Sequence, residues 1–294
     1  MIDNTTHGNE IETRIQSDLD GTAMRLLSWP IENPRAVIQI AHGLAEHCGR
    51  YRRFAAALNA AGYSVTAHDH RGHGPQATTL GDAGNPGWDG LIHDTKQVTA
   101  IARKAHPDVQ LILFGHSMGS FVTQNFLQEY SDQIDGVILS GTTDIGMVAT
   151  MIAAGGEAPS LKSYNAAFEP SRTDFDWLSR DHREVDLYVA DPLCGFDPND
   201  AFSAGMLEGA LKLANEDAFA NVRQDLPILI AAGDADPLNA NLALLHALTG
   251  KLQTAGLNRV TSKHYSGARH EILNEINRDD ITSDIIDWID AILS

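Results

Sequence analysis

A serine flanked by glycines stands where a buried strand is expected to end. The pentapeptide Gly-His-Ser-Met-Gly at 115–119 follows the apolar run 109–114, and a helical pattern occupies residues 120–130. A strand, a Gly-x-Ser-x-Gly turn and a helix together form a nucleophile elbow, in which a strained turn exposes the serine hydroxyl in front of a helix N-terminus. The pattern therefore predicts Ser117 as a nucleophile.

A serine hydroxyl is a poor nucleophile near neutral pH, so it needs a base, and the base needs an orienting carboxylate. His270 lies just past the last expected strand, in a loop that can reach back over Ser117. In a strand–turn–helix site of this kind, the acid lies between the serine and the histidine in chain order. Asp236 fits this order, and its position before Pro237 at the far side of the turn favours it, which predicts a triad of Ser117, His270 and Asp236. Asp234 in the same turn, and Asp144 after the preceding strand, are the alternative acids.

Attack on a carbonyl group creates an oxyanion, which needs preorganised N–H donors. One predicted donor is the backbone N–H of Met118, the residue after the nucleophile. The second is expected in the loop after the strand 36–41, where Leu44 follows a His-Gly pair.

Apolar runs and helical patterns alternate along most of the chain. A hairpin is expected about Asp20-Gly21, followed by strands at 36–41, 63–67, 109–114, 136–139, 227–232 and 260–265. Helices are expected at 51–61, 88–106, 120–130, 239–255 and 275–293. This alternation predicts an α/β fold with a mostly parallel sheet covered on both faces, and a site at the carboxyl ends of its strands.

Residues 144–220 break this rhythm with two consecutive glycines and four prolines. An insertion of this length in an α/β domain is more often a lid than a second domain. The expected parts are a core of 1–143 and 221–294 with a helical cap, or lid, at 144–220. Its large apolar side chains either line an acyl pocket or, for most of them, pack the cap on the core: Phe168, Phe175, Trp177, Leu178, Tyr188, Phe196 and Phe202.

Composition excludes several classes of function. The formal net charge of −18 argues against nucleic acid, anionic lipid and strongly anionic substrates as partners. No run approaches the roughly 18 apolar residues of a membrane span, and the first 14 residues lack the pattern of a signal peptide. Cys48 and Cys194 define no disulfide framework. We therefore expect a cytoplasmic protein without a transmembrane segment.

Four motifs in this order resemble the monoacylglycerol lipase and lysophospholipase-like branch of the α/β-hydrolases. They are His-Gly-Leu-Ala-Glu-His with Gly-Arg-Tyr at 42–51, Asp-His-Arg-Gly-His-Gly at 69–74, Gly-His-Ser-Met-Gly-Ser at 115–120 and Gly-Ala-Arg-His-Glu at 267–271. The resemblance covers 1–143 and 221–294 and implies the triad and the oxyanion donors already predicted.

The resemblance also implies that Glu46, Arg50 and His116 lie near the alcohol leaving group, where they can hydrogen-bond a glycerol-like hydroxyl. The chain departs from the family at Ala45, where glycine is usual, and at Ser266, where proline is frequent. Ala45 could narrow the oxyanion loop and alter which alcohols fit.

The resulting hypothesis is a serine esterase that needs no cofactor and hydrolyses neutral esters such as monoacylglycerols through an acyl-enzyme. A lysophospholipase and a short-chain esterase remain alternatives, as do a peptidase and a cofactor-free haloperoxidase of the same superfamily. A non-catalytic small-molecule receptor is also open. The expected partner is a small-molecule ester, and the oligomeric state is open between monomer and dimer.

His68, His70 and His73 form a His-x-His-x-x-His pattern that could indicate metal ligands. Metal-dependent hydrolases with a related motif carry an aspartate where this chain has Gly72, and the neighbouring Arg71 would repel a cation. The prediction is therefore that these are structural loop histidines and that there is no metal site.

Overall fold

One eight-stranded sheet runs through the computed structural model, which describes residues 8–294. In spatial order its strands are β1 (Ile11–Gln16), β2 (Ala23–Trp29), β4 (Tyr63–His68), β3 (Ala36–Ala41), β5 (Gln110–His116), β6 (Gly136–Ser140), β7 (Ile228–Gly233) and β8 (Val260–Tyr265). β2 pairs antiparallel with both β1 and β4, and the strands from β4 to β8 run parallel to one another. The predicted α/β class is confirmed. The predictions made for residues 1–7, including the lack of a signal peptide there, lie outside the described part.

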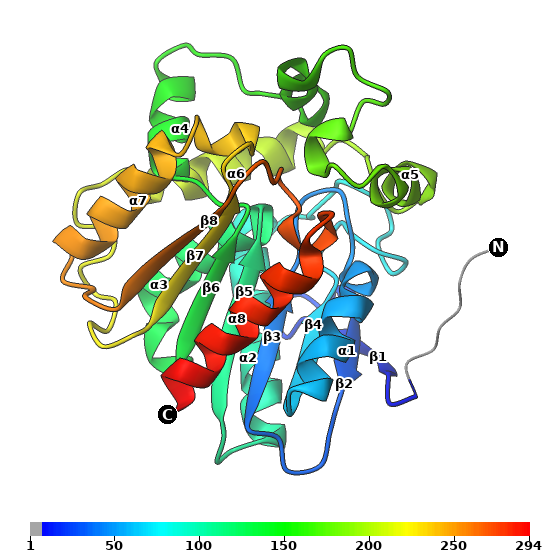
Figure 1. Ribbon diagram of the computed structural model, residues 1–294, viewed down its shortest axis with the longest axis vertical. Coiled ribbons are helices and arrows are strands. Elements are labelled where there is room, and N and C mark those ends of the chain that lie inside the picture. The colour runs from blue at the N-terminus through cyan, green and yellow to red at the C-terminus, as the bar shows by residue number, and fades with distance from the viewer. Residues whose placement is uncertain (1–7) are drawn as a thin grey trace.

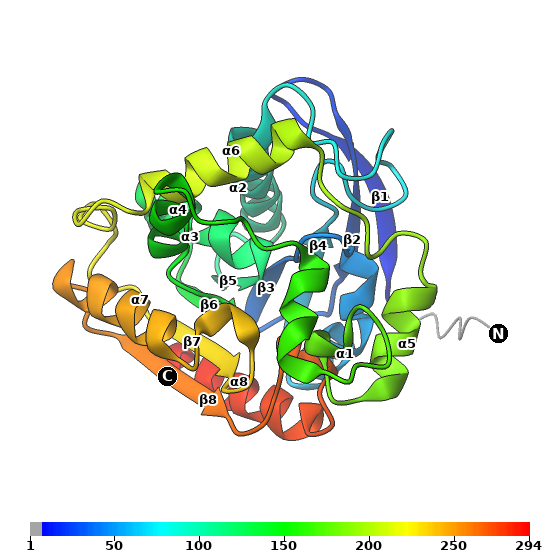
Figure 2. The same cartoon turned by 90° about the horizontal axis from the view of Figure 1, so that it is seen from above.

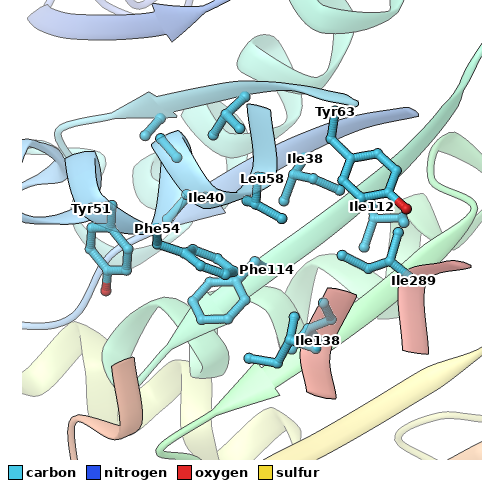
Figure 3. Close-up of a cluster of buried hydrophobic side chains, with 14 of the residues drawn as sticks. Ile38, Ile40, Tyr51, Phe54, Leu58, Tyr63, Ile112, Phe114, Ile138 and Ile289 are labelled. Atoms are coloured by element: carbon cyan, nitrogen blue, oxygen red, sulfur yellow. The ribbon is translucent and has the colours of Figure 1, made fainter. Parts of the chain in front are cut away.

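Helices cover both faces of the sheet (Figure 1). On one face lie α1 (Arg52–Ala60) and α8 (Arg278–Leu293), and on the other α2 (Gly87–Ala105), α3 (Met118–Tyr130) and α7 (Ala243–Thr254). Figure 3 shows the hydrophobic cluster on the first of these faces, which includes Ile112 and Phe114 of the sheet and Ile289 of α8. Each such fully buried side chain contributes about 1.5–3 kcal/mol. This packing fixes the strand ends that carry the polar loops.

The expected helix at 239–255 begins later than predicted. Ala240, Asn241 and Leu242 all have positive φ angles, of 50°, 54° and 70°, so α7 starts only at Ala243. The side chain of Asn239 stabilises this turn, because it donates to the Gly233 carbonyl at 2.8 Å and accepts from the Leu242 N–H at 2.9 Å. These contacts depend on the geometry of the turn rather than on the spacing of apolar residues, so the helical pattern of the sequence did not reveal them.

The segment between β6 and β7 contains α4 (Ile145–Ala153), α5 (His182–Ala190) and α6 (Asp200–Lys212), with 3₁₀ helices at Leu161–Phe168 and Asp176–Leu178. Figures 1 and 2 show these helices gathered over the carboxyl edge of the sheet. We call residues 144–220 the insertion; its division from the core as a lid stays a prediction. Among the described residues, no helix combines the length and the apolar content needed to cross a membrane.

Candidate active site

Ser117 occupies a strained turn between β5 and α3. Its φ of 50° and ψ of −121° are unusual for a residue with a side chain. The turn has no space for larger neighbours, because a Cβ atom on Gly119 would lie 2.1 Å from the Ala41 carbonyl oxygen. The Ser117 N–H donates to the Ser140 carbonyl at 2.9 Å, which ties the turn to the next strand. The predicted tight turn is therefore present, with its serine partly exposed.

His270 and Asp236 form a buried pair beside this turn. His270 Nδ1 lies 2.9 Å from Asp236 Oδ2, and the two residues are 2% and 1% exposed. Burial alone lowers the pKa of His270, but the charge and hydrogen bond of Asp236 outweigh burial and raise it above the ordinary value. His270 and Ser117 line the same small pocket. With Nδ1 turned to Asp236, the Nε2 atom of His270 is left to exchange a proton.

The two alternative carboxylates accept hydrogen bonds from backbone N–H groups rather than from His270. Asp234 accepts from the Gly267 N–H at 2.6 Å, so it joins the turn after β7 to the loop after β8. Asp144 accepts from the Met147 N–H at 3.0 Å as the N-cap of α4. Among the described residues, only Asp236 of these three carboxylates bonds to the histidine.

The loop after β3 packs against the elbow. A Cβ atom on Gly43 would lie 3.2 Å from Ser117 Cβ, which places the adjoining Leu44 amide beside the serine. Met118 is the first residue of α3, and the first N–H groups of a helix have no acceptor within the helix. Ala45 has a φ of 55°, in the left-handed region that favours glycine. The carbonyl of Ala45 is held by the Tyr188 hydroxyl at 2.8 Å.

Glu46, Arg50 and His116 line one polar pocket, which shares Glu46 and His116 with the pocket at the serine. Arg50 donates to Glu46 at 2.8 Å and, through both terminal nitrogens, to Glu271 at 2.5 and 2.8 Å. Glu46 also accepts from the Gly43 N–H at 2.6 Å and the Tyr51 hydroxyl at 2.8 Å. Burial and the nearby His270 lower the pKa of His116 to about 4, so its imidazole is neutral near pH 7.

Two contacts at this site were not predicted. Glu271 follows His270 directly, and although burial opposes ionisation, Arg50 lowers the pKa of Glu271 to about 2. The sequence signal that could have indicated Glu271 is its position next to His270 in the motif at 267–271. Trp177 comes from the insertion and stacks on His270, with 4.7 Å between ring centroids. No local sequence pattern could have indicated this second contact.

An apolar cavity of about 440 Å³ adjoins the small pocket and shares Leu44 and Leu161 with it. Its other apolar walls come mainly from α4 and α6: Ile145, Ala149, Ile152, Met206, Leu207 and Ala210. None of the seven large insertion side chains considered for an acyl pocket lines this cavity. Five of them are buried, and Trp177, Leu178 and Tyr188 line the pocket at the serine instead. Packing is thus the main role of this set.

The predicted loop histidines stack on one another and on His42, with centroids 4.5 Å apart for His42 and His70 and 4.8 Å for His68 and His70. In residues 8–294, the group whose ligand atoms converge as a metal site requires lies elsewhere, at His47, Asp191 and Cys194. There His47 Nδ1 accepts from the Gly49 N–H at 3.1 Å, which leaves the ring proton on Nε2, 2.9 Å from Asp191. This is the geometry of a hydrogen-bonded pair rather than of a metal ligand.

The chain is similar to known proteins over most of its length. Residues 32–277 match the family described as serine aminopeptidase, S33 (Hydrolase_4). A monoacylglycerol lipase of Mycolicibacterium smegmatis is 29% identical over 266 residues, which cover 88% of this chain and 90% of that protein. A monoglyceride lipase of Mus musculus is 29% identical over 290 residues, covering 94% and 88%. A solved structure, a highly thermostable carboxyl esterase from Bacillus coagulans in complex with glycerol, has a TM-score of 0.85 and 28% identity, and covers 97% of this chain and 99% of its own.

Proposed function

The chain belongs to the serine aminopeptidase S33 (Hydrolase_4) family of α/β-hydrolases, and from this premise we propose that it is a serine esterase acting on monoacylglycerols. The observation that carries the proposal is the position of Ser117 and the His270–Asp236 pair. Ser117 and His270 line a small pocket that shares residues with an apolar cavity and with a polar pocket. An ester of a fatty acid with a small polyol requires both environments.

In the proposed mechanism, Ser117 Oγ attacks the ester carbonyl while His270 Nε2 takes its proton. Asp236 orients the imidazole and stabilises its cation. The backbone N–H groups of Leu44 and Met118 bind the oxyanion, and each such donor is worth about 3 kcal/mol of barrier. The alcohol departs with the proton from His270. Water, activated by the same imidazole, then hydrolyses the acyl-enzyme.

The two neighbouring pockets support the choice of substrate. The cavity between α4 and α6 is lined mainly by aliphatic side chains, which suits a fatty acyl chain. The polar pocket offers Glu46, Arg50 and His116 to alcohol hydroxyls. Two glutamates against one arginine leave the Glu46–Arg50–Glu271 group with a formal charge of −1, which favours a neutral glycerol over a phosphorylated headgroup.

The test is the initial rate on p-nitrophenyl esters of about two to sixteen carbons, followed by monoacylglycerol and lysophosphatidylcholine of matched chain length. We expect Ser117→Ala to lower kcat by about 10⁴-fold or more, since the triad acts as a unit. A serine-directed fluorophosphonate should label the wild type and the exposed-serine control Ser163→Ala, but not Ser117→Ala. Faster turnover of the lysophospholipid would replace the proposed substrate, and an unlabelled, inactive wild type would refute the esterase.

A further inference from the structure

The insertion contacts the loop that carries His270 along its backbone. The His270 N–H points to the Trp177 carbonyl at 3.4 Å, and the Glu271 N–H donates to the Leu178 carbonyl at 2.8 Å. Side chains extend this pairing, for the Ser179 hydroxyl donates to the Asn274 carbonyl at 2.7 Å. The stretch 177–179 therefore lies alongside the histidine loop and is hydrogen-bonded to it.

The indole of Trp177 rests on the imidazole of His270. Their centroids are 4.7 Å apart and their planes are inclined by 39°. Tyr164 stacks on the indole at 5.0 Å and holds it there. Trp177 is only 2% exposed, and it lines the pocket that contains Ser117.

The Trp177 side chain does more than fill space. Its Nε1–H is buried and has no hydrogen-bond partner among the described residues. Leaving a buried donor unpaired is unfavourable, and a phenylalanine or leucine would pack there without that penalty. Packing alone is therefore a poor explanation for an indole at this position, and its aromatic face lies on His270.

We propose that Trp177 is a positioning residue for His270: it holds the imidazole against Asp236 and stabilises the imidazolium formed when His270 takes the Ser117 proton. The electron-rich face of an indole attracts a cation more strongly than that of any other side chain, and the attraction increases when water is excluded. This inference rests on the proposed esterase function.

Other charged and titratable groups also face His270. Asp236, Glu271 and Glu46 favour its protonated form, and His116 stacks on it at 4.9 Å and disfavours that form. Substitution of Trp177 leaves all four in place. A change in the titration of His270 can therefore be assigned to the indole.

The test is the pH profile of kcat/KM for p-nitrophenyl butyrate in the wild type, Trp177→Phe and Trp177→Leu. Activity requires a neutral His270, so the acid limb reports its pKa in the free enzyme. We expect the limb to move down by about half a unit in Trp177→Phe and about one unit in Trp177→Leu. Alongside this shift, kcat should fall about 3-fold and about 10-fold, while KM changes less than about two-fold.

Phe175→Leu is the matched control. Phe175 belongs to the same apolar cluster of the insertion, but it stacks on Tyr188 rather than on His270. We expect this variant to lower Tm and leave the acid limb unmoved. If Trp177→Leu does not fold, Trp177→Phe decides alone. An active wild type whose acid limb is the same in the Trp177 variants overturns the role of Trp177 only; a wild type that hydrolyses no ester overturns the proposed function as well.

Discussion

Arg50 lies between two buried glutamates in the polar pocket. Its guanidinium makes a bidentate pair with Glu271 and a single contact with Glu46, and the three side chains are 12%, 7% and 4% exposed. Asn274 donates a further hydrogen bond to Glu271 at 2.8 Å. Since the pKa of Glu271 is lowered to about 2, that residue stays ionised at any pH used for an assay. The pocket thus offers a fixed arginine whose charge is already neutralised.

Glu271→Gln should change the preference for the leaving group. The variant keeps the shape of the side chain but removes one negative charge beside the alcohol. We expect kcat/KM for lysophosphatidic acid to rise about 5- to 10-fold relative to monoacylglycerol, because a charge effect of about 1 kcal/mol in the pocket corresponds to that ratio. Glu129→Gln, which removes a charge from the exposed part of α3, should leave the ratio unchanged. An unchanged ratio in Glu271→Gln would mean that the leaving group binds elsewhere.

At the scale of the elements, α7 ties both ends of the insertion to the core. Lys251 on α7 donates to Asp144, the N-cap of α4, at 3.1 Å and to the Leu213 carbonyl after α6 at 2.9 Å. Its side chain is 15% exposed and that of Asp144 is 3% exposed. The two helices that form most of the apolar cavity, α4 and α6, therefore share one anchor.

Lys251→Met should loosen this anchor and leave Asp144 buried without its partner. We expect a loss of about 2–3 kcal/mol in the free energy of unfolding, measured with urea, because an unpaired buried charge is costly. KM should increase more for twelve-carbon than for two-carbon esters, since only the longer chain needs the cavity. Lys212→Met breaks an exposed pair with Asp89 and should cost less than about 0.5 kcal/mol. Equal losses in the two variants would contradict the anchor.

The sequence alone was sufficient to locate the elements that are determined by residues close together in the chain. The expected bounds of β3, a continuous apolar run, and of β8 match the structure to the residue, and Gly62, with a φ of 92°, ends α1 where a glycine cap was expected. The position of Asp236, directly before Pro237 and at the far side of the turn, also indicated it rather than Asp234 as the residue that meets His270. In these cases the decisive physical constraint acts within a few residues or along the order of the strands.

Contacts between distant segments could not be predicted in this way. The indole of Trp177 reaches His270 only because the insertion folds back over the histidine loop. The apolar cavity likewise forms where α4 and α6 meet, and most of the large side chains that were candidates for its walls pack elsewhere. Which face of an insertion is buried depends on its docking, and docking leaves no periodic signal in the chain.

At the scale of the whole molecule, the protein combines a strongly acidic composition with a buried group of neutral histidines. His42, His68, His70 and His73 are each at most 2% exposed. Burial lowers the pKa of all four, and that of His73 to about 4. The carboxylates that give the net charge of −18 titrate mainly below about pH 5. Between pH 6.5 and 5 the histidines should therefore dominate the pH dependence of stability.

The sign follows from proton binding. The unfolded chain protonates His73 as the pH falls through about 6.5, whereas the folded protein excludes that proton until about pH 4, so stability is lost across this window. At pH 5.5, His73 alone lowers the free energy of unfolding by about 1.4 kcal/mol relative to pH 7.5. We expect the free energy of unfolding, measured with urea, to differ less between the two pH values in His73→Asn than in the wild type, by about this amount. His182→Asn, at an exposed histidine, should keep the full difference. If the wild type is equally stable at both pH values, the buried histidines accept protons without unfolding and the cluster is not a source of acid sensitivity.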